Sequence, residues 1–399
     1  MKKVGVIFGG VTCEHDVSVV TGLQLIENMD RMKYDIYPIY IHSDGEWYSD
    51  SRLIDQTIYK DFDKMKSVLT KGYIAPNKKG IIIPPKNFLA KEVFIELDVV
   101  IPAMHGLNGE NGALQGLLDL ADIPYTSSGV LGSAVGMDKI MMKKVFDAYA
   151  IPILPYTYFL RSEWKKSQAV VIAQVEAVLR YPMFVKPANL GSSIGISKAT
   201  DRESLIAAID VAVEYDERVI VENGVEDLKE INCSAIGRGE HVDVSVCEQP
   251  VSWKEFLTFD EKYLRNEGGK NGGAKSGEGA SGMASMSRKV PADITEEQTA
   301  EVKALTEKVF KALSSKGVVR VDFIVDNADG KVYVNEINTI PGSFAFYLWE
   351  YGGTTYSQLI DRLIEIAEED DAEKKANTYT YKSNIIESAG KSLKTGFHK

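Results

Sequence analysis

The sequence predicts an α/β protein with α+β parts, built around an open parallel sheet near the N-terminus. Apolar runs at residues 4–8, 35–41 and 99–104 alternate with helical patterns, as the strands of a parallel sheet do. Later, two runs at residues 317–325 and 331–342 alternate β-branched and polar side chains around an Asp-Gly turn. These later runs indicate an antiparallel hairpin, so the chain combines a parallel unit with an antiparallel one.

The remaining elements follow from the same two periodicities. Apolar residues at helical spacing predict helices over residues 17–29, 112–121, 138–149, 201–215, 295–313 and 356–368. Short apolar and β-branched runs predict strands over residues 183–186, 195–199, 219–222 and 231–236. Residues 50–90 mix short apolar runs with Lys, Gly and Pro, which predicts an irregular insertion.

Length and composition limit the class of protein. A chain of 399 residues is too long for one compact core and predicts two or three domains. A net charge of -11, with no basic cluster, argues against a nucleic-acid partner. Cys13, Cys233 and Cys247 lack paired spacing, so neither a disulfide framework nor a zinc site is indicated. Because no apolar stretch reaches membrane-spanning length and the first one is too short for a signal peptide, we expect a cytoplasmic enzyme with no membrane partner.

Two segments near the C-terminal half have biased composition. Residues 253–289 are rich in Gly, Ser and Lys, which predicts a flexible loop. Such a loop within a domain usually covers a site, and an interdomain linker is the alternative. The residues from 370 onward are rich in Lys and Ser and predict a peripheral tail.

The predicted hairpin carries three oxygen donors. Asp322 lies in its first strand, and Glu336 and Asn338 lie two residues apart in the second, on one face. Mg²⁺ prefers carboxylate and amide oxygens that leave room for substrate phosphates. A solvated strand face is the alternative, but Glu336 and Asn338 are interleaved with apolar residues and run into a Pro-Gly loop. The hairpin therefore predicts a magnesium site.

A small-residue loop predicts phosphate binding. Lys186 ends a predicted strand and opens the segment KPANLGSSIG at residues 186–195, whose backbone N–H groups can approach phosphate oxygens. The segment also matches the G-x-S-x-G pattern of serine hydrolases through Ser193. That pattern requires a helix directly afterwards, whereas residues 195–199 predict a strand. No Walker A pattern occurs, so this loop is the main candidate for nucleotide phosphate.

Two further loops follow predicted parallel strands, where ligands bind in open α/β sheets. Residues 14–18 (EHDVS) offer Glu14, a carboxylate that suits an ammonium group. Capping of the next helix by Asp16 or Ser18 is an equal alternative. Residues 105–112 (HGLNGENG) form a glycine-rich loop whose role stays open from these residues alone.

Taken together, these blocks resemble the D-alanine–D-alanine ligases of the ATP-grasp superfamily, from residue 4 to about residue 367. The order and spacing of the motifs agree. They are FGG at 8–10, EHDVS at 14–18, HG at 105–106, GENG at 109–112, GVL at 129–131, MDK at 137–139, FVKP at 184–187, KY at 262–263 and RVD at 320–322. Members of that family use ATP and Mg²⁺ to join two D-alanines for peptidoglycan precursor synthesis.

The resemblance implies a three-domain ATP-grasp architecture. Its parts would be an N-terminal α/β substrate domain at 1–127, a central subdomain at 128–221, a catalytic domain at 222–370 with a lid loop at 253–289, and a tail at 371–399. Family members are commonly dimers, so the resemblance also implies a homodimer.

The resemblance further implies roles for individual residues, with ATP between the central and C-terminal domains. The nucleotide would be held by Lys139 and Lys186 at its phosphates, Glu222 near adenine, Glu230 at the ribose and Lys262 at the γ-phosphate. Asp322, Glu336 and Asn338 would hold two Mg²⁺ ions, with Mn²⁺ as an alternative.

The amino-acid site is implied in the same way. Glu14 would bind the first ammonium group and form a triad with Ser192 and Tyr263, and His105 would line the pocket. The γ-phosphate would pass to the first carboxylate, and the second amino group would attack the resulting acyl phosphate. Arg320 and the Gly342 N–H would stabilise the oxyanion.

The chain departs from the family pattern after Pro341. Family members have a longer segment there, whose serine holds the carboxylate of the second substrate; here Tyr347 has that spacing and Ser343 comes too early. We therefore expect D-alanine as the acceptor, with D-lactate, D-serine or another amino acid as alternatives. A nucleotide-binding protein without catalysis is an alternative of another class. It is disfavoured because Lys186, Arg320 and the three oxygen donors are all present.

Overall fold

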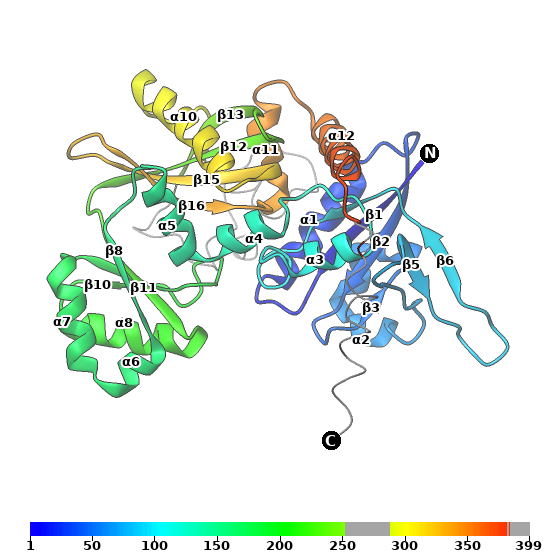
Figure 1. Ribbon diagram of the computed structural model, residues 1–399, viewed down its shortest axis with the longest axis horizontal. Helices are drawn as coiled ribbons and strands as arrows, with labels where there is room; N and C mark the ends of the chain where they lie inside the picture. The colour runs from blue at the N-terminus through cyan, green and yellow to red at the C-terminus, as the bar shows by residue number, and fades with distance from the viewer. Residues whose placement is uncertain (252–287, 381–382, 384–399) are drawn as a thin grey trace, which may run out of the picture.

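The computed structural model describes residues 1–251, 288–380 and 383, arranged as four sheets with helices packed on them (Figure 1). The N-terminal part lies at one end of the molecule, and two further sheets lie at the other (Figure 1). In the described part of the chain, no helix combines the length and apolar character needed to cross a membrane.

The N-terminal sheet is the predicted open parallel sheet. Its strand order is β3-β2-β1-β7; β2, β1 and β7 are parallel, and the short β3 is antiparallel to β2. Its elements are β1 Lys2–Gly9, α1 His15–Asn28, β2 Tyr34–Ile41, β3 Trp47–Tyr48, β7 Val99–Pro102 and α3 Ala113–Leu120. Residues Val4 to Phe8 of β1 are buried because the strand is covered on both faces.

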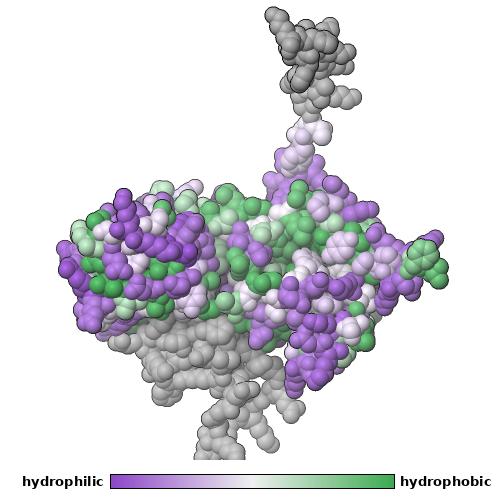
Figure 2. Space-filling view, turned by 90° about the horizontal axis from the view of Figure 1, so that it is seen from below, coloured by the Kyte–Doolittle hydropathy of each residue, from purple (hydrophilic) through white to green (hydrophobic). Residues whose placement is uncertain are grey.

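The expectation of an irregular insertion at residues 50–90 was wrong in part. The segment contains η1 Ser51–Ile54, η2 Gln56–Asp61, α2 Phe62–Met65, β4 Tyr73–Ile74 and β5 Gly80–Ile83, and with β6 Val93–Glu96 it forms a small antiparallel sheet. These runs are too short for periodicity to reveal. The loop between β5 and β6 projects from the molecule and has an apolar tip (Figure 2), where Phe88 and Leu89 are almost fully exposed.

The second sheet is antiparallel, with strand order β10-β9-β11-β8 and helices packed on one side. Its elements are β8 Tyr156–Leu160, α6 Arg161–Lys166, α7 Gln168–Val178, β9 Met183–Pro187, β10 Ser197–Ala199, α8 Arg202–Tyr215 and β11 Arg218–Asn223. A strand follows the Gly-Ser loop, as predicted, which removes the helix that a serine hydrolase elbow requires.

The third sheet has the order β14-β13-β12-β15-β16 and contains the predicted hairpin. Its strands are β12 Leu228–Arg238, β13 His241–Pro250, β14 Arg288–Lys289, β15 Lys316–Asp326 and β16 Val332–Asn338. One face packs on α5 Lys139–Ala148 and α10 Glu296–Ala312, with Phe146 and Phe310 in that core. The other face carries the polar residues and lines a cavity.

Four elements connect the sheets: α4 Val130–Met137, the turn η5 Gly342–Ala345, α11 Phe346–Glu350 and α12 Tyr356–Lys375. The C-terminal helix was expected to end at residue 368, but α12 continues to Lys375, so the first residues of the expected tail are helical. Ion pairs explain the extension: Lys316 Nζ lies 2.6 Å from Asp370, and Lys374 Nζ lies 3.3 Å from Asp119.

Gly317 joins β15 to the N-terminal part and gives a test of this packing. Its φ is +75°, and a Cβ there would lie 1.8 Å from the Thr126 carbonyl oxygen. We expect Gly317→Ala to lower the free energy of unfolding by about 2 kcal/mol or more, because strain and backbone clash add. Urea unfolding measures this.

Gly239→Ala is the matched control, since Gly239 also has a positive φ of +56° but nothing lies within 4 Å of its added Cβ. Equal costs for the two substitutions would contradict the proposed importance of the Thr126 contact.

Candidate active site

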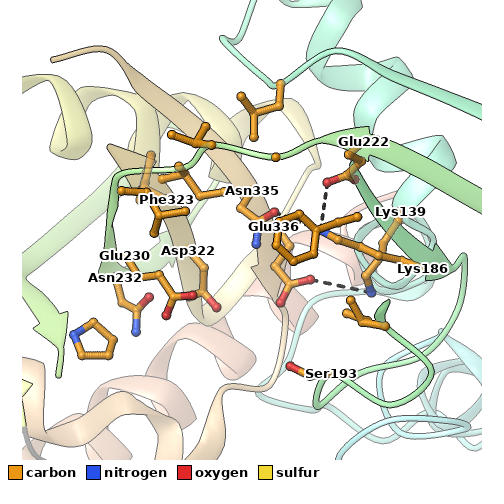
Figure 3. A pocket seen from close by; sticks show the side chains of 18 of the residues that line it. Lys139, Lys186, Ser193, Glu222, Glu230, Asn232, Asp322, Phe323, Asn335 and Glu336 are labelled. Atoms are coloured by element: carbon orange, nitrogen blue, oxygen red, sulfur yellow. Dashed lines mark hydrogen bonds and ion pairs between the residues drawn. The ribbon is translucent and has the colours of Figure 1, made fainter. Parts of the chain in front are cut away.

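A cavity of about 1190 Å³ lies between the second and third sheets. Lys186 and Glu222 enter it from β9 and β11, and Asp322 and Glu336 enter it from β15 and β16 (Figure 3). Lys139 reaches it from the start of α5 (Figure 3). Charged groups of both signs therefore face one another across the space between the two sheets.

A β-bulge decides which residues of β16 face this cavity. Val334 pairs with Phe323 and packs in the core, whereas Glu336 pairs with Asp322, so Asn335 is an extra residue between two ladder positions. Beyond the bulge, Ile337 returns to the core. Without the extra residue, period-two geometry would turn Glu336 toward the same side as Val334.

The three predicted oxygen donors do converge. Asp322 and Glu336 are direct cross-strand partners, and Asn338 Nδ2 donates to Asp322 Oδ2 at 3.0 Å. Arg320 holds the Asp322 carboxylate with two hydrogen bonds, from Nε at 2.6 Å and from Nη2 at 2.7 Å. Arg320 is only 8% exposed, and its guanidinium lines the cavity while paired with Asp322.

These donors suit a hard divalent cation. Two carboxylates and an amide oxygen are ligands that Mg²⁺ prefers, and the adjoining cavity leaves room for phosphate oxygens. Among the residues described here, no group of three or more His, Cys, Asp or Glu is placed to hold a metal, so the third donor of this set is the Asn338 amide.

Two lysines meet one buried carboxylate at the other wall. Lys186 Nζ lies 2.8 Å from Glu222 Oε2 and Lys143 Nζ lies 3.3 Å from Glu222 Oε1. Burial disfavours the ionised carboxylate, but the two ammonium groups outweigh it and lower the pKa of Glu222 to about 2. Burial lowers the pKa of Lys143, whereas Glu222 and Glu336 outweigh burial and raise the pKa of Lys186.

Lys186 and Lys139 reach the third sheet. Lys186 Nζ donates to Asn335 Oδ1 at 3.3 Å, which uses the side chain of the bulge residue. Lys139 Nζ donates to the Leu190 carbonyl at 2.6 Å and lies 3.6 Å from Glu336 Oε2. Both lysines therefore connect β16 to the opposite wall of the cavity, Lys139 through Glu336 and Lys186 through Asn335 (Figure 3).

Glu14 and Ser192 are brought together although 178 residues separate them: Ser192 Oγ donates to Glu14 Oε1. The glycines beside them are required by this approach, because a Cβ on Gly106 or Gly191 would lie 2.5 or 2.7 Å from Glu14 Oε2. Ser192 itself has a φ of 51°, a strained value for a residue with a side chain. The Glu14 side chain makes no cap hydrogen bond to α1, and Ser18 Oγ bonds Gly9 and Ala103 instead of capping the helix.

Beside Glu14 lies a second, smaller cavity of about 400 Å³, lined also by Glu110 and Asn338. Sequence reasoning gave Glu110 no role, yet its carboxylate accepts the N–H groups of Gly106 at 2.7 Å and Ile340 at 3.1 Å. It thereby joins the N-terminal loop to the end of β16. Burial and the neighbouring Glu14 charge raise the pKa of Glu110 to about 8.

His105 is buried close to this cavity. Its Nε2 lies 2.9 Å from Thr21 Oγ1, and burial lowers its pKa to about 4, so the ring is neutral at pH 7. Arg320 also contributes to that shift. His105 therefore lies near the hairpin as well as the N-terminal loop, which agrees with a place beside the amino-acid pocket.

The remaining predicted residues have simpler placements. Glu230 lines the large cavity from β12, and Gly342 opens η5. Lys262 and Tyr263 lie outside the described residues. Lys143 was missed, although it lies four residues after Lys139, one helical turn away on α5.

Three comparisons with known proteins agree with this geometry. The family model described as D-ala D-ala ligase N-terminus matches residues 3–128, and that described as D-ala D-ala ligase C-terminus matches residues 145–365. The D-alanine–D-alanine ligase of Caldicellulosiruptor bescii is 38% identical over 385 residues, covering 95% of this chain and 98% of the relative. That of Bacillus cytotoxicus is 37% identical over 382 residues, covering 95% and 99%.

Solved structures give the same result. The D-alanine–D-alanine ligase from Coxiella burnetii superposes with a TM-score of 0.75 at 25% identity, covering 99% of each chain. The VanG D-Ala:D-Ser ligase from Enterococcus faecalis has a TM-score of 0.75 at 30% identity, covering 92% of this chain and 99% of that one.

The fold is therefore that of the ATP-grasp ligases, with the candidate site between two antiparallel sheets. Within that class, the chain belongs to the D-alanine–D-alanine ligase family.

The Lys143–Glu222–Lys186 cluster predicts a pH-dependent stability. Because the pKa of Glu222 is about 2 in the fold against an ordinary value of 4.5, its charge stabilises the fold at neutral pH. This contribution is lost as the pH falls toward 2. Glu222→Gln leaves two buried cations without their partner, so we expect a loss of about 3 kcal/mol at pH 7 that shrinks toward pH 3.

Urea unfolding at several pH values measures this loss. Glu176→Gln, which breaks an exposed pair with Arg202, is the control and should change little at any pH. A cost for Glu222→Gln that is the same at pH 7 and pH 3 would contradict the assigned ionisation.

Glu336 tests the metal interpretation. If Glu336 is a ligand, Glu336→Gln should reduce Mg²⁺-dependent ADP formation by about 100-fold or more, because one of two carboxylate ligands is lost. Glu301→Gln, on the exposed side of α10, should keep the wild-type rate. Undiminished turnover in Glu336→Gln would refute the assignment.

Proposed function

We propose that this protein is an ATP-dependent, ADP-forming ligase that joins two D-alanines through an acyl phosphate, for peptidoglycan precursor synthesis. The observation that carries the proposal is the opposition of Asp322, Glu336 and Asn338 to Lys139 and Lys186 across one cavity. Curated relatives at 36–38% identity are named D-alanine–D-alanine ligase, which supports it.

ATP occupies the large cavity. Its phosphates lie at Lys139 and Lys186, whose ammonium groups face Glu336 and Asn335 of the third sheet. Adenine lies near Glu222, where Leu154, Phe184 and Leu228 supply an apolar wall, and the ribose lies at Glu230.

Asp322, Glu336 and Asn338 hold two Mg²⁺ ions, for which Mn²⁺ is an alternative. Bound metal neutralises charge on the phosphoryl oxygens during transfer. Asp322, one of the residues that would hold the metal, also accepts two hydrogen bonds from the Arg320 guanidinium, which keeps Arg320 beside the donor set.

Glu14 binds the ammonium group of the first D-alanine, and Ser192 holds the Glu14 carboxylate in place. His105 lines the pocket as a neutral ring. Lys262 and Tyr263 complete the γ-phosphate and lid contacts by analogy with the family. A carboxylate oxygen of this substrate attacks the γ-phosphorus, and ADP leaves.

The amino group of the second D-alanine then attacks the carbonyl carbon of the acyl phosphate and loses a proton, and inorganic phosphate leaves. Arg320 and the Gly342 N–H stabilise the oxyanion of this step. Both lie next to the metal donors, since Arg320 pairs with Asn338 across the sheet and Gly342 follows β16.

The larger organisation belongs to the same proposal. The substrate domain is residues 1–127, the central subdomain 128–221 and the catalytic domain 222–370 with its lid at 253–289, followed by the tail at 371–399. The protein acts in the cytoplasm as a homodimer, as members of its family commonly do.

One observation favours a second candidate, a ligase of the same mechanism with another acceptor. Tyr347 occupies the spacing expected for a serine, and a solved structure 30% identical to this chain is titled a D-Ala:D-Ser ligase.

ADP release, with products identified by mass, tests both candidates. Purified protein is supplied with ATP and Mg²⁺ and with D-alanine, L-alanine, D-serine and D-lactate, alone and in pairs. We expect D-alanyl-D-alanine as the best product. ADP formation with a different product would favour the second candidate, and no ADP with any pair would refute the ligase proposal.

A further inference from the structure

The polar and charged side chains of the third sheet lie in rows across its strands. Successive rows mark successive positions along the cavity. One row, called the metal row here because it contains Asp322 and Glu336, crosses four strands: Glu248 pairs with Asn232, which pairs with Asp322, which pairs with Glu336. The next row toward α11 contains Arg320, opposite Ser234 and Asn338, and there Trp349 Nε1 donates to Ser234 Oγ at 3.1 Å. Glu230 and Leu228 lie on the side of the metal row away from Arg320, because they precede Asn232 on β12.

This order separates the substrates. Phosphoryl transfer takes place at the metal row, with the ribose on the Glu230 side, so the reacting amino acids lie on the Arg320 side. The first amino acid is placed at the β16 edge, where Glu14 and Asn338 line the smaller cavity. The second must approach Arg320 from the other direction, along β13 and α11.

A buried polar cluster occupies that direction. Glu248, at 2% exposure, accepts hydrogen bonds from Asn232 Nδ2 at 3.0 Å, Tyr347 hydroxyl at 2.9 Å and Arg288 Nη1 at 2.8 Å. The Arg288 guanidinium also lies over the Tyr347 ring, 3.7 Å from its centroid. Glu248 and Tyr347 therefore fix the position of Arg288 at the cavity wall.

The acceptor carries a carboxylate at neutral pH, and burial of that anion requires a cationic partner. Of the residues that the structure describes, four cations line the large cavity: Lys139, Lys186, Arg288 and Arg320. The two lysines face the phosphates, and Arg320 faces the reacting centre. Arg288 is the cation left on the acceptor side.

We propose that Arg288, held by Glu248 and Tyr347, binds the carboxylate of the acceptor amino acid and makes the enzyme select acceptors that carry one. The proposal rests on the ligase function proposed above. A guanidinium suits this task because its planar fork matches a carboxylate and keeps its charge at all working pH values. The Tyr347 ring forms the floor under the guanidinium, so this short segment replaces the missing serine with a different anion site.

Competition between D-alanine and D-alaninamide as acceptors tests the proposal, because the amide lacks the negative charge. The ratio of the two products, measured by mass with both acceptors present, gives the preference for the carboxylate. We expect Arg288→Met to reduce that preference by at least about tenfold, the size of one charge-assisted contact. Arg288→Lys, which keeps the charge but not the fork, should lose less.

Two controls separate binding from structural damage. Hydroxylamine attacks the acyl phosphate in place of the acceptor and carries no carboxylate, so its reaction does not need Arg288. The rate at which Arg288→Met forms D-alanyl hydroxamate should therefore stay within about twofold of wild type. Arg202→Met removes an arginine from a surface pair with Glu176 and should match wild type in both assays.

An unchanged preference in Arg288→Met would overturn the proposal, as would a parallel fall in hydroxamate formation. If Arg288→Met does not fold, two single variants test the proposal instead: Arg288→Lys, and Tyr347→Ala, which removes the ring under the guanidinium. An unchanged preference for the carboxylate in both variants would overturn the proposal. Wild-type protein that makes hydroxamate but no dipeptide would instead refute the proposed ligase function, and the inference with it.

Discussion

The extra residue in β16 is the constraint on which the site depends. A strand that packs Val334 into a core must send Glu336 the same way, unless one residue is inserted between the two ladder positions. Asn335 is that residue, and its amide accepts a hydrogen bond from Lys186 of the opposing sheet. The bulge therefore turns a carboxylate toward the cavity and also anchors the facing wall.

Charge compensation is the second theme of the cavity. Glu222 is held between Lys143 and Lys186, Arg320 is paired with Asp322, and Arg288 is paired with Glu248. Each buried ion thus has a partner within the protein, which limits the cost of desolvation. In the proposed function, substrates and metal would exchange these partners instead of meeting isolated charges, so binding would rearrange pairs that already exist.

The sequence predicted the parts of the molecule whose signal is local. The β15–β16 hairpin, its three oxygen donors and the parallel N-terminal strands follow from alternation and turn chemistry. The contact between Glu14 and Ser192 followed only from family resemblance, because nothing local connects residues 178 positions apart.

Some of the missed parts lack such a signal, whereas β13 and α7 carry alternation and helical spacing that the predictions did not use. Helix α4 consists of small and apolar residues with two glycines and shows no polar face, so periodicity does not mark it. The β16 bulge depends on the register against β15, which the sequence does not show. The Glu248–Arg288–Tyr347 cluster joins β13, β14 and α11, which are far apart in the sequence. Helical spacing from Lys139 could have identified Lys143. Its partner Glu222 could not be identified in this way, because Glu222 lies on β11 in the second sheet.

The central claim is that the carboxylate of the first D-alanine attacks phosphorus, and the fate of its oxygen tests this most directly. D-alanine labelled with ¹⁸O in both carboxyl oxygens is incubated with ATP, Mg²⁺ and the protein, and the released phosphate is analysed by mass. The account predicts one ¹⁸O in each phosphate, because the bridging oxygen of the acyl phosphate leaves with phosphorus. Dipeptide formation with unlabelled phosphate would contradict it.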